Sequence, residues 1–375
     1  MTTPPSGGSA FINQMEPWID ENEVRHMTEY LTSGGWLTEF TKTKEFEAML
    51  AEYTGAKHCV VVANGTVSLS IALWARGIGP GDEVLVPDLT MIATPNSVRL
   101  VGAVPVLVDV EPATLCMDLG LAERALTPRT KAVSFVSLNG RAPDMMKWKA
   151  FCDAHGLFLL EDAAQSLGSR QGGTHLGRFG AVGSFSFSTP KIITTGQGGA
   201  LITDDDGLAL RMRKIKDFGR ERGGVDWHDM MGQNFKFTDV QAVLGIEQMK
   251  KLAWRVERKK AIYRRYESAL RGVPQLEMLE MLETSDETAP WFVDIYVPEP
   301  ERLRDHLKSR MIGSRLVYPP VNKQAIYPTA ETFPVTESFC SRGLWLPSAS
   351  FLTDETIERI CAEIRGFFES GARAG

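Results

Sequence analysis

The chain has 375 residues, of which 43% are hydrophobic and 23% charged, a composition typical of a globular protein with one large core and a smaller appended unit. The formal net charge is -6 and no block of lysines and arginines occurs, which argues against a nucleic-acid-binding or membrane-surface protein. The sequence has no run of about 18 apolar residues, so no membrane span is predicted.

The five cysteines are scattered and form no C-x-x-C pair, so neither a disulfide framework nor a zinc site is predicted. We expect reduced thiols in a cytoplasmic protein. The six histidines have no metal-ligand spacing, and the acidic run 204–206 is interpreted as the solvated start of a helix, so no metal site is predicted. The first ten or so residues are expected to be a flexible leader.

Short apolar runs rich in β-branched residues predict seven strands, and helical patterns such as 67–78 and 144–156 lie between them. This alternation predicts an α/β fold, with a mostly parallel seven-stranded sheet covered on both faces. The predicted strands are 58–63, 83–87, 105–109, 131–137, 157–162, 183–187 and 200–204.

A long helical pattern from Thr238 to Arg271 predicts one helix that joins two domains. The large domain is expected to span residues 1–255 and a small C-terminal α+β domain residues 256–375. The elements expected near and beyond this boundary are a strand at 291–297, a helix at 299–311, a short segment at 313–319 and a final helix at 354–370.

Candidate functional residues follow the predicted strands, because ligands of such sheets bind at the carboxyl ends of the strands. Asn64, Gly65 and Thr66 come between a strand and a helix, where free N–H groups and a hydroxyl could bind a phosphate. A plain turn with a helix cap is the alternative. Asp162 ends the fifth strand and is either a buried carboxylate at the sheet edge or a helix cap.

Lys191 stands between Pro190 and a glycine-rich run, with Ser186 just upstream. A lysine, a carboxylate and a phosphate cradle together indicate pyridoxal 5'-phosphate (PLP): Lys191 would form the Schiff base and Asp162 would keep the pyridine nitrogen protonated. A dinucleotide loop does not fit, since the glycines precede a strand instead of opening a helix, and no Walker motif occurs. An ordinary loop lysine remains the alternative.

Several motifs in chain order resemble the DegT/DnrJ/EryC1/StrS family of sugar aminotransferases, from about residue 12 to the C-terminus. They include ANGTVSLSIAL, GPGDEVLVPDLT, LLEDAAQSLGS, GSFSFSTPKIITTGQGGALITDD and GQNFKFTDVQAVLGIEQMKKL. The resemblance implies a fold type I PLP-dependent transferase that works as a homodimer.

The resemblance also implies roles for single residues. Lys191 matches the Schiff-base lysine and Asp162 the partner of the pyridine nitrogen, while Gln165 matches a residue near the phenolic oxygen of the ring. Asn234 matches an asparagine that reaches the neighbouring subunit's cofactor phosphate, which would make each active site composite. From the residues alone, Gln165 could be a polar helix residue and Asn234 a turn residue. The phosphate ligands would be Gly65, Thr66 and Ser186.

A related branch that deoxygenates sugars has histidine at the lysine's position, so Lys191 favours transamination over a dehydratase or lyase. In that hypothesis L-glutamate gives its amino group to the ketone of a nucleotide-linked keto-deoxy sugar. Lys191 would carry the proton between the donor's α-carbon and the cofactor, with a pKa lowered by burial and cationic neighbours. The run 191–199 resembles GDP-perosamine synthases, which aminate a GDP-linked 4-keto-6-deoxy sugar. A non-catalytic PLP-binding relative is a further alternative.

The chain departs from the family pattern around the expected substrate pocket. Met91 replaces an aromatic residue that stacks on the PLP ring, and Ser137 and Asn322 stand where relatives commonly carry histidine. Glu39 and Phe40 replace a small residue and a glycine. A sugar with its ketone at C3 therefore stays open. Candidate substrate-binding residues are Trp36, Thr38, Arg220, Tyr318 and Asn322, although Arg220 could also be a plain loop charge.

Overall fold

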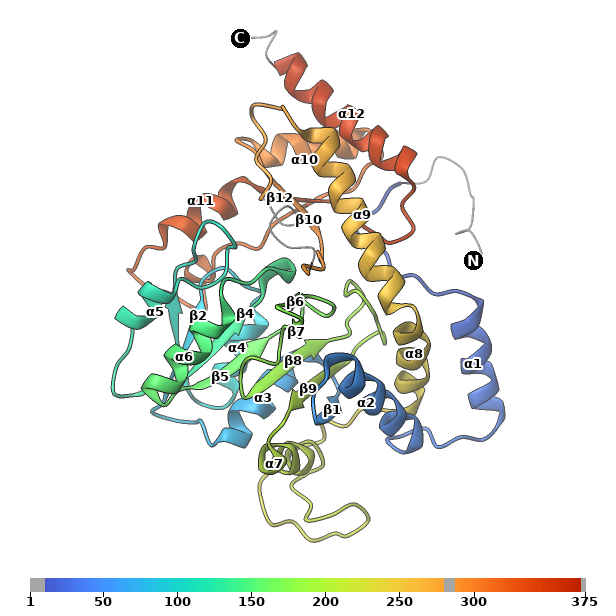
Figure 1. The fold of residues 1–375 in the computed structure, drawn as a ribbon, viewed down its shortest axis with the longest axis vertical. Helices are drawn as coiled ribbons and strands as arrows, with labels where there is room; N and C mark the ends of the chain where they lie inside the picture. Colours follow the sequence, from blue (N-terminus) through green and yellow to red (C-terminus); the bar gives the residue numbers. More distant parts are fainter. Residues whose placement is uncertain (1–10, 280–286, 372–375) are drawn as a thin grey trace.

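The computed structural model describes residues 11–279 and 287–371, so the expectation for the first ten residues lies outside the described part. A seven-stranded sheet forms its centre (Figure 1). Each of the seven predicted strands is found, with its ends within one residue of the prediction. The strands are β1 (His58–Val62), β2 (Glu83–Pro87), β3 (Val104–Val108), β4 (Thr130–Val136), β5 (Phe158–Asp162), β8 (Val182–Ser186) and β9 (Gly199–Thr203).

The strand order is β1-β9-β8-β5-β4-β2-β3, and β9 is antiparallel to both of its neighbours. The other strand pairs of this sheet, from β8 to β3, are parallel. The carboxyl ends of β1, β8, β5, β4 and β2 consequently meet at one edge, where β9 begins. The prediction of a mostly parallel α/β sheet is confirmed.

Helices cover both faces of the sheet, because each central strand is apolar on both sides. Val61 of β1 packs with Phe46 and Ile246 of the helices on one face, whereas Val60 packs with Leu69 on the other. The helices of the first face are α2 (Thr41–Thr54) and α8 (Asp239–Lys250). Those of the second are α3 (Gly65–Arg76), α4 (Ala93–Leu100) and α7 (Asp206–Lys216), while α5 (Leu119–Arg124) and α6 (Met145–His155) pack near β4 and β5.

Short polar side chains start several of these helices. The Asn64 side chain accepts a hydrogen bond from the Val67 N–H at 3.0 Å and caps α3. Asp205 likewise accepts from the Leu208 N–H at 2.8 Å, so the acidic run before α7 is a helix start, as the sequence predicts. Within 11–279 and 287–371, no group of three His, Cys, Asp or Glu side chains is placed to hold a metal ion.

The long predicted helix from 238 to 271 is in fact two helices, α8 and α9 (Leu252–Leu270), which meet at Lys251. The Lys251 N–H bonds to the Gln248 carbonyl three residues earlier at 3.2 Å, which closes a tight turn. The Lys251 ammonium also pairs with Asp20 at 3.0 Å and with Glu23, next to the start of α1 (Glu21–Thr32). The prediction of one continuous helix is therefore wrong.

A second sheet lies above the first in Figure 1, with strand order β10-β12-β11. Its strands are β10 (Val293–Tyr296), β11 (Arg315–Leu316) and β12 (Gly343–Leu346), and its core includes residues of α9, α10 (Pro300–Ser309) and α12 (Asp354–Gly371). The sequence did not predict β12, α11 (Pro334–Arg342) or the short β6 (Arg170–Gln171) and β7 (Thr174–His175) hairpin. The expected domain boundary at 255/256 falls in the first turns of α9.

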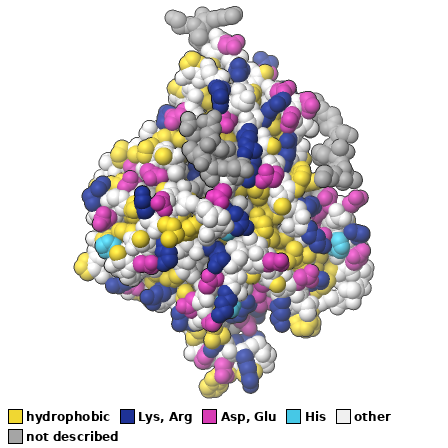
Figure 2. All heavy atoms as spheres, in the orientation of Figure 1, with side chains coloured by type: hydrophobic (Ala, Val, Ile, Leu, Met, Phe, Trp, Pro, Cys, Tyr) yellow, Lys and Arg dark blue, Asp and Glu magenta, His cyan; other side chains and the backbone are white. Residues whose placement is uncertain are grey.

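The face drawn in Figure 2 carries Lys and Arg side chains interspersed with Asp and Glu. In the described residues, no helix combines the length and the apolarity that crossing a bilayer requires.

Candidate active site

Lys191 lies in the loop between β8 and β9, at the edge where the parallel strands end. Its backbone N–H donates to the Ser188 carbonyl at 2.9 Å, and Arg255 of α9 donates to the carbonyl of the next residue, Ile192, at 3.0 Å. The Lys191 Nζ lies 3.9 Å from the centroid of the Trp291 ring. These contacts hold the amine at one place against an aromatic wall.

Burial lowers the pKa of Lys191 to about 8, which makes the neutral amine accessible near neutral pH. The expectation of cationic neighbours is wrong, because the charge that acts on this amine is the carboxylate of Asp162, which favours the protonated form. Desolvation is thus the cause of the shift.

Asp162 is the last residue of β5 and is 7% exposed. Burial raises the pKa of its carboxyl group, and the Thr94 hydroxyl and the charge of Lys191 oppose that shift. The Thr94 hydroxyl donates to Oδ2 at 2.8 Å, and the Ala164 N–H donates to Oδ1 at 3.2 Å. This carboxylate is held in one orientation, and a cationic ring nitrogen placed beside it would be strongly stabilised.

The start of α3 forms an anion cradle with the end of β8. The Asn64 cap takes the N–H of Val67, which leaves the N–H groups of Gly65 and Thr66 for an anion at the positive end of the helix. A Cβ on Gly65 would lie 2.7 Å from the Cβ of Ser186, so only glycine allows this approach. The hydroxyls of Thr66 and Ser186 are partly buried at this edge.

Gln165 follows Asp162 in the turn after β5 and is buried. Its Oε1 accepts a hydrogen bond from the Asn139 backbone N–H at 2.8 Å. A backbone N–H can only donate, so this bond fixes the orientation of the amide. The Nε2 group remains available as a donor, since it has no acceptor within the described part of the chain.

These groups fit PLP by their own chemistry. The cradle can bind a phosphate, Asp162 can hold a protonated pyridine nitrogen, and Lys191 can reach a neutral, nucleophilic state. The sequence prediction that Gly65, Thr66, Asp162, Gln165, Ser186 and Lys191 gather at one edge of the sheet agrees with the positions of these residues.

Two predicted substrate residues come from the smaller sheet and its flanks. Tyr318 is partly buried with its ring edge-on to Trp345 at 4.8 Å. Burial raises the pKa of its hydroxyl, and the charge of Asp162 acts in the same direction. Asn322 is buried; its N–H donates to Asp88 at 2.7 Å and its amide to Glu337 at 3.1 Å. Asn322 thus joins two carboxylates within the protein.

The remaining candidates lie in exposed segments. Trp36 is 63% exposed, Thr38 is exposed, and Met91 is 43% exposed with its sulfur accepting from the Ala93 N–H. Arg220 pairs with Asp226 at 3.0 Å. Asn234 is exposed and pairs through its backbone with Asp217, in the same segment as Arg220. Within one subunit no contact joins these residues to Lys191 or Asp162 in the described part of the chain.

Three residues that the sequence analysis missed make direct contacts in this site: Thr94 with Asp162, Trp291 with Lys191, and Asn139 with Gln165. Thr94 lies in the stretch around Met91 and could have been noted as a hydroxyl after a strand. Trp291 precedes a strand of the other sheet, and no local pattern marks it.

The model of the DegT/DnrJ/EryC1/StrS aminotransferase family matches residues 17–365. GDP-perosamine synthase of Vibrio cholerae is 33% identical over 364 residues, covering 94% of this chain and 98% of that protein. Among solved structures, the aminotransferase TlmJ from Streptoalloteichus hindustanus is 30% identical with a TM-score of 0.92, covering 96% of this chain and 100% of that chain. DesV of S. venezuelae, solved in complex with a ketimine intermediate, is 32% identical with a TM-score of 0.88, covering 95% and 99%.

The matches extend over almost the whole chain, and the chemistry of the sheet edge agrees with them independently. The Lys191 amine, the Asp162 carboxylate and the anion cradle at Gly65 are the groups that PLP chemistry needs. The chain therefore belongs to the DegT/DnrJ/EryC1/StrS aminotransferase family and is a PLP-dependent sugar aminotransferase.

Proposed function

We propose that this enzyme moves the amino group of L-glutamate to the ketone of a nucleotide-linked keto-deoxy sugar. The substrate that we favour is GDP-4-keto-6-deoxymannose, which would give GDP-perosamine for a cell-surface polysaccharide or glycoside. The observation that carries the reaction type is the partly buried Lys191, with a pKa of about 8, within electrostatic reach of the buried Asp162. The similarity to GDP-perosamine synthase supports the choice of sugar.

In this proposal PLP supplies an electron sink that stabilises negative charge on the amino donor's α-carbon. Asp162, held in place by Thr94, would stabilise a proton on the ring nitrogen of the cofactor. Lys191 would take the proton from the donor's α-carbon and deliver it to the C4′ carbon of the cofactor, which a group with a pKa near the working pH does efficiently. Gly65, Thr66 and Ser186 bind the phosphate.

An exposed arginine beside the aromatic side chains at this edge supports a nucleotide-linked sugar as the amino acceptor. Trp291 and Trp345 lie with their ring centroids 5.9 Å apart, and Tyr318 packs edge-on against Trp345. Both indoles are only 4% exposed, so their faces are covered by protein. Arg315 is exposed, lies 5.4 Å from the Trp345 centroid and forms no ion pair with a described residue, so we assign it to the diphosphate of the nucleotide.

We further propose that the active enzyme is a homodimer with composite sites. Large apolar side chains are exposed in the same segments as Thr38 and Asn234, namely Trp36, Leu37, Phe40, Trp227 and Met231. Groups of exposed large apolar side chains are typical of interaction surfaces. Asn234 would then serve the cofactor phosphate of the partner subunit. The five cysteines are free thiols, which is consistent with the cytoplasmic location that we propose.

The test begins with the visible absorption of the purified protein loaded with PLP. Loss of the visible band on addition of L-glutamate, followed by its return on addition of GDP-4-keto-6-deoxymannose with an amino sugar found by mass spectrometry, is the expected result. Lys191→Ala is the control and should show no return within the same time. If the band returned only with another nucleotide-linked keto sugar, that sugar would be assigned as the substrate instead. Loss of a hydroxyl from the sugar without amination would indicate a dehydratase, and an unchanged band with every donor a non-catalytic relative.

A further inference from the structure

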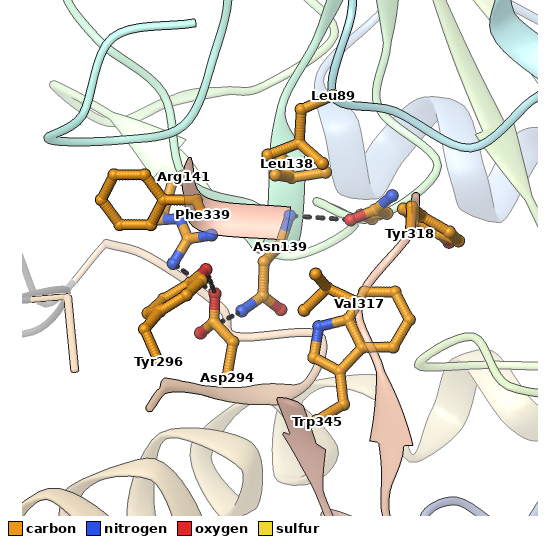
Figure 3. A pocket seen from close by; sticks show the side chains of 11 residues that line it. Leu89, Leu138, Asn139, Arg141, Asp294, Tyr296, Val317, Tyr318, Phe339 and Trp345 are labelled. Carbon is orange, nitrogen blue, oxygen red and sulfur yellow. Dashed lines mark hydrogen bonds and ion pairs between the residues drawn. The ribbon is translucent and has the colours of Figure 1, made fainter. Parts of the chain in front are cut away.

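The turn after β4 is tied to the smaller sheet by the side chain of Asn139 (Figure 3). Asn139 has φ 54° and ψ 30°, a left-handed conformation that asparagine tolerates better than most residues. Its Oδ1 accepts from the Phe292 N–H at 2.6 Å, and its Nδ2 donates to the Phe292 carbonyl at 3.0 Å and to Asp294 at 2.9 Å. One side chain thus satisfies three polar groups at the start of β10.

Asp294 connects the hydrogen bonds of Asn139 to a buried ion pair. Its other oxygen lies 2.8 Å from the Arg141 guanidinium and accepts a hydrogen bond from the Tyr296 hydroxyl at 2.8 Å. Arg141 and Asp294 are 4% and 1% exposed, so solvent does not screen the pair. Figure 3 shows Asn139, Arg141 and Tyr296 converging on Asp294 from two sides.

The space enclosed by these side chains is about 10 Å³, which holds at most one water molecule. A substrate or cofactor cannot enter it. The cluster of Asn139, Arg141, Asp294 and Tyr296 is therefore a fixed joint between the turn after β4 and the strand β10, and we call it the polar clasp.

The polar clasp reaches the active site through the backbone of Asn139, whose N–H donates to Oε1 of Gln165. If the turn moved, the Gln165 amide would lose the one hydrogen-bond partner that it has among the described residues. The amide could then rotate and present an acceptor where a donor is needed. The direction of the Nε2 donor therefore depends on a side-chain contact made in the other sheet.

We infer that Asn139 is a positioning residue which, anchored by the Arg141–Asp294 pair, fixes Gln165 as a hydrogen-bond donor to the phenolic oxygen of PLP. This inference rests on the proposed position of Gln165 beside that oxygen. An N–H donor would stabilise the negatively charged phenolic oxygen of PLP. The proton shared between this oxygen and the Lys191 nitrogen would then be released at a lower pH. The polar clasp consequently sets the pH at which the bound cofactor changes colour.

The experiment titrates the visible absorption of the PLP-loaded protein with pH, without any sugar or amino donor. Asn139→Gly keeps the backbone N–H and tolerates the left-handed conformation, so it removes the clasp without straining the turn. We expect the spectral transition to move to higher pH, by roughly one unit in Gln165→Leu and by less in Asn139→Gly. In the Gln165→Leu background, Asn139→Gly should add no further shift, because the two residues act through one hydrogen bond.

Neither Gln165→Leu nor Asn139→Gly removes a charged or titratable group that faces the site. Those groups are Lys191, Asp162, Tyr318, Arg141 and Asp294.

Thr336→Val is the matched control. The Thr336 hydroxyl also joins the C-terminal part to the large sheet, by donating to Asp109 at 2.7 Å, but it does not contact Gln165. It should leave the transition unchanged.

An unshifted transition in Asn139→Gly would overturn the inference, as would an equal shift of Asn139→Gly in the wild-type and the Gln165→Leu backgrounds. A shift of the same size in Thr336→Val would also overturn it, because the shift would then reflect a general loss of stability and not the hydrogen bond to Gln165. A protein that takes up no PLP would instead refute the proposed use of the cofactor, so the two failures are distinguishable.

Discussion

The Nζ of Lys191 lies 3.9 Å from the centre of the Trp291 ring, and the Trp291 Nε1 donates a hydrogen bond to the Pro190 carbonyl at 2.8 Å. The indole therefore holds both the backbone just before the lysine and the end of its side chain. Because Trp291 lies two residues before β10 of the smaller sheet, the position of the reactive amine depends on packing between the two sheets.

Substitution of Trp291 separates its two roles. Trp291→Phe keeps an aromatic face but loses the hydrogen bond, and we expect the rate of the glutamate half-reaction to fall about fivefold. Trp291→Ala frees the lysine as well and should reduce this rate about a hundredfold, since misplacement of a reacting group is costly. Single-turnover absorbance measurements give both rates. Equal rates in the two variants would show that the ring face does not position Lys191.

The pKa of Lys191 predicts how the apo-protein takes up its cofactor. Burial sets this pKa at about 8 in the folded protein, below its ordinary value of 10.5, and the neutral amine is the form that reacts. The rate of PLP uptake should therefore rise with pH up to about 8 and then level off, instead of rising further. Stopped-flow absorbance at a series of pH values measures it.

The same shift affects the stability of the apo-protein. Between pH 8 and 10.5 the unfolded chain holds a proton on this lysine that the folded chain has lost, so the free energy of unfolding should increase with pH over that window. Lys191→Met removes this contribution and serves as the control. A free energy of unfolding with the same pH dependence in both proteins would contradict the lowered pKa.

Asp162→Asn tests the partner of the ring nitrogen. An amide cannot hold that nitrogen protonated, so the rate of the glutamate half-reaction should fall by about 100-fold or more, while the fold and the phosphate cradle persist. Loss of the anion also removes the charge that favours protonated Lys191, and the plateau of PLP uptake should begin at a lower pH. Thr94→Val, which leaves the charge but removes one hydrogen bond of 2.8 Å, should have a smaller effect. A near-normal rate in Asp162→Asn would exclude this role.

The sheet and much of the site were predictable from sequence because both depend on local patterns. Continuous runs such as 83–87 mark buried parallel strands, and residues that end such strands meet at one edge whatever the details of packing. This is why Gly65, Asp162 and Lys191 were found together.

The contacts that complete the site were not predictable in this way, because they join segments far apart in the chain. Trp291 reaches Lys191, and Asn139 reaches Phe292, only once the two sheets have packed. The break at Lys251 was missed for the same reason: its sequence is helical, and its ammonium pairs with Asp20 and Glu23 near the other end of the chain. Desolvation of Lys191 is likewise a property of the packed site.

Arg315 tests the proposed place of the nucleotide. Removal of its charge by Arg315→Gln should raise the KM for the nucleotide-linked sugar about tenfold and leave the glutamate half-reaction unchanged, because the lost contact is with the proposed diphosphate and not with the amine. Arg302→Gln is a matched control, since Arg302 is exposed and pairs with Glu299 on α10. If Arg315→Gln instead raised the KM for glutamate, Arg315 would be assigned to the carboxylate of the amino donor.

The composite site can be tested by mixing two inactive proteins. If Asn234 serves the partner subunit, a dimer of one Lys191→Ala subunit and one Asn234→Ala subunit contains one complete site, formed by Lys191 of the second subunit and Asn234 of the first. Random exchange of equal amounts should then restore about a quarter of the wild-type activity, because half of the dimers are mixed and half of their sites are complete. If Asn234 serves its own subunit, both sites of the mixed dimer lack a residue and no activity returns. The exposed Asn234 makes no contact with Lys191 of its own chain among the described residues, which is compatible with the first outcome.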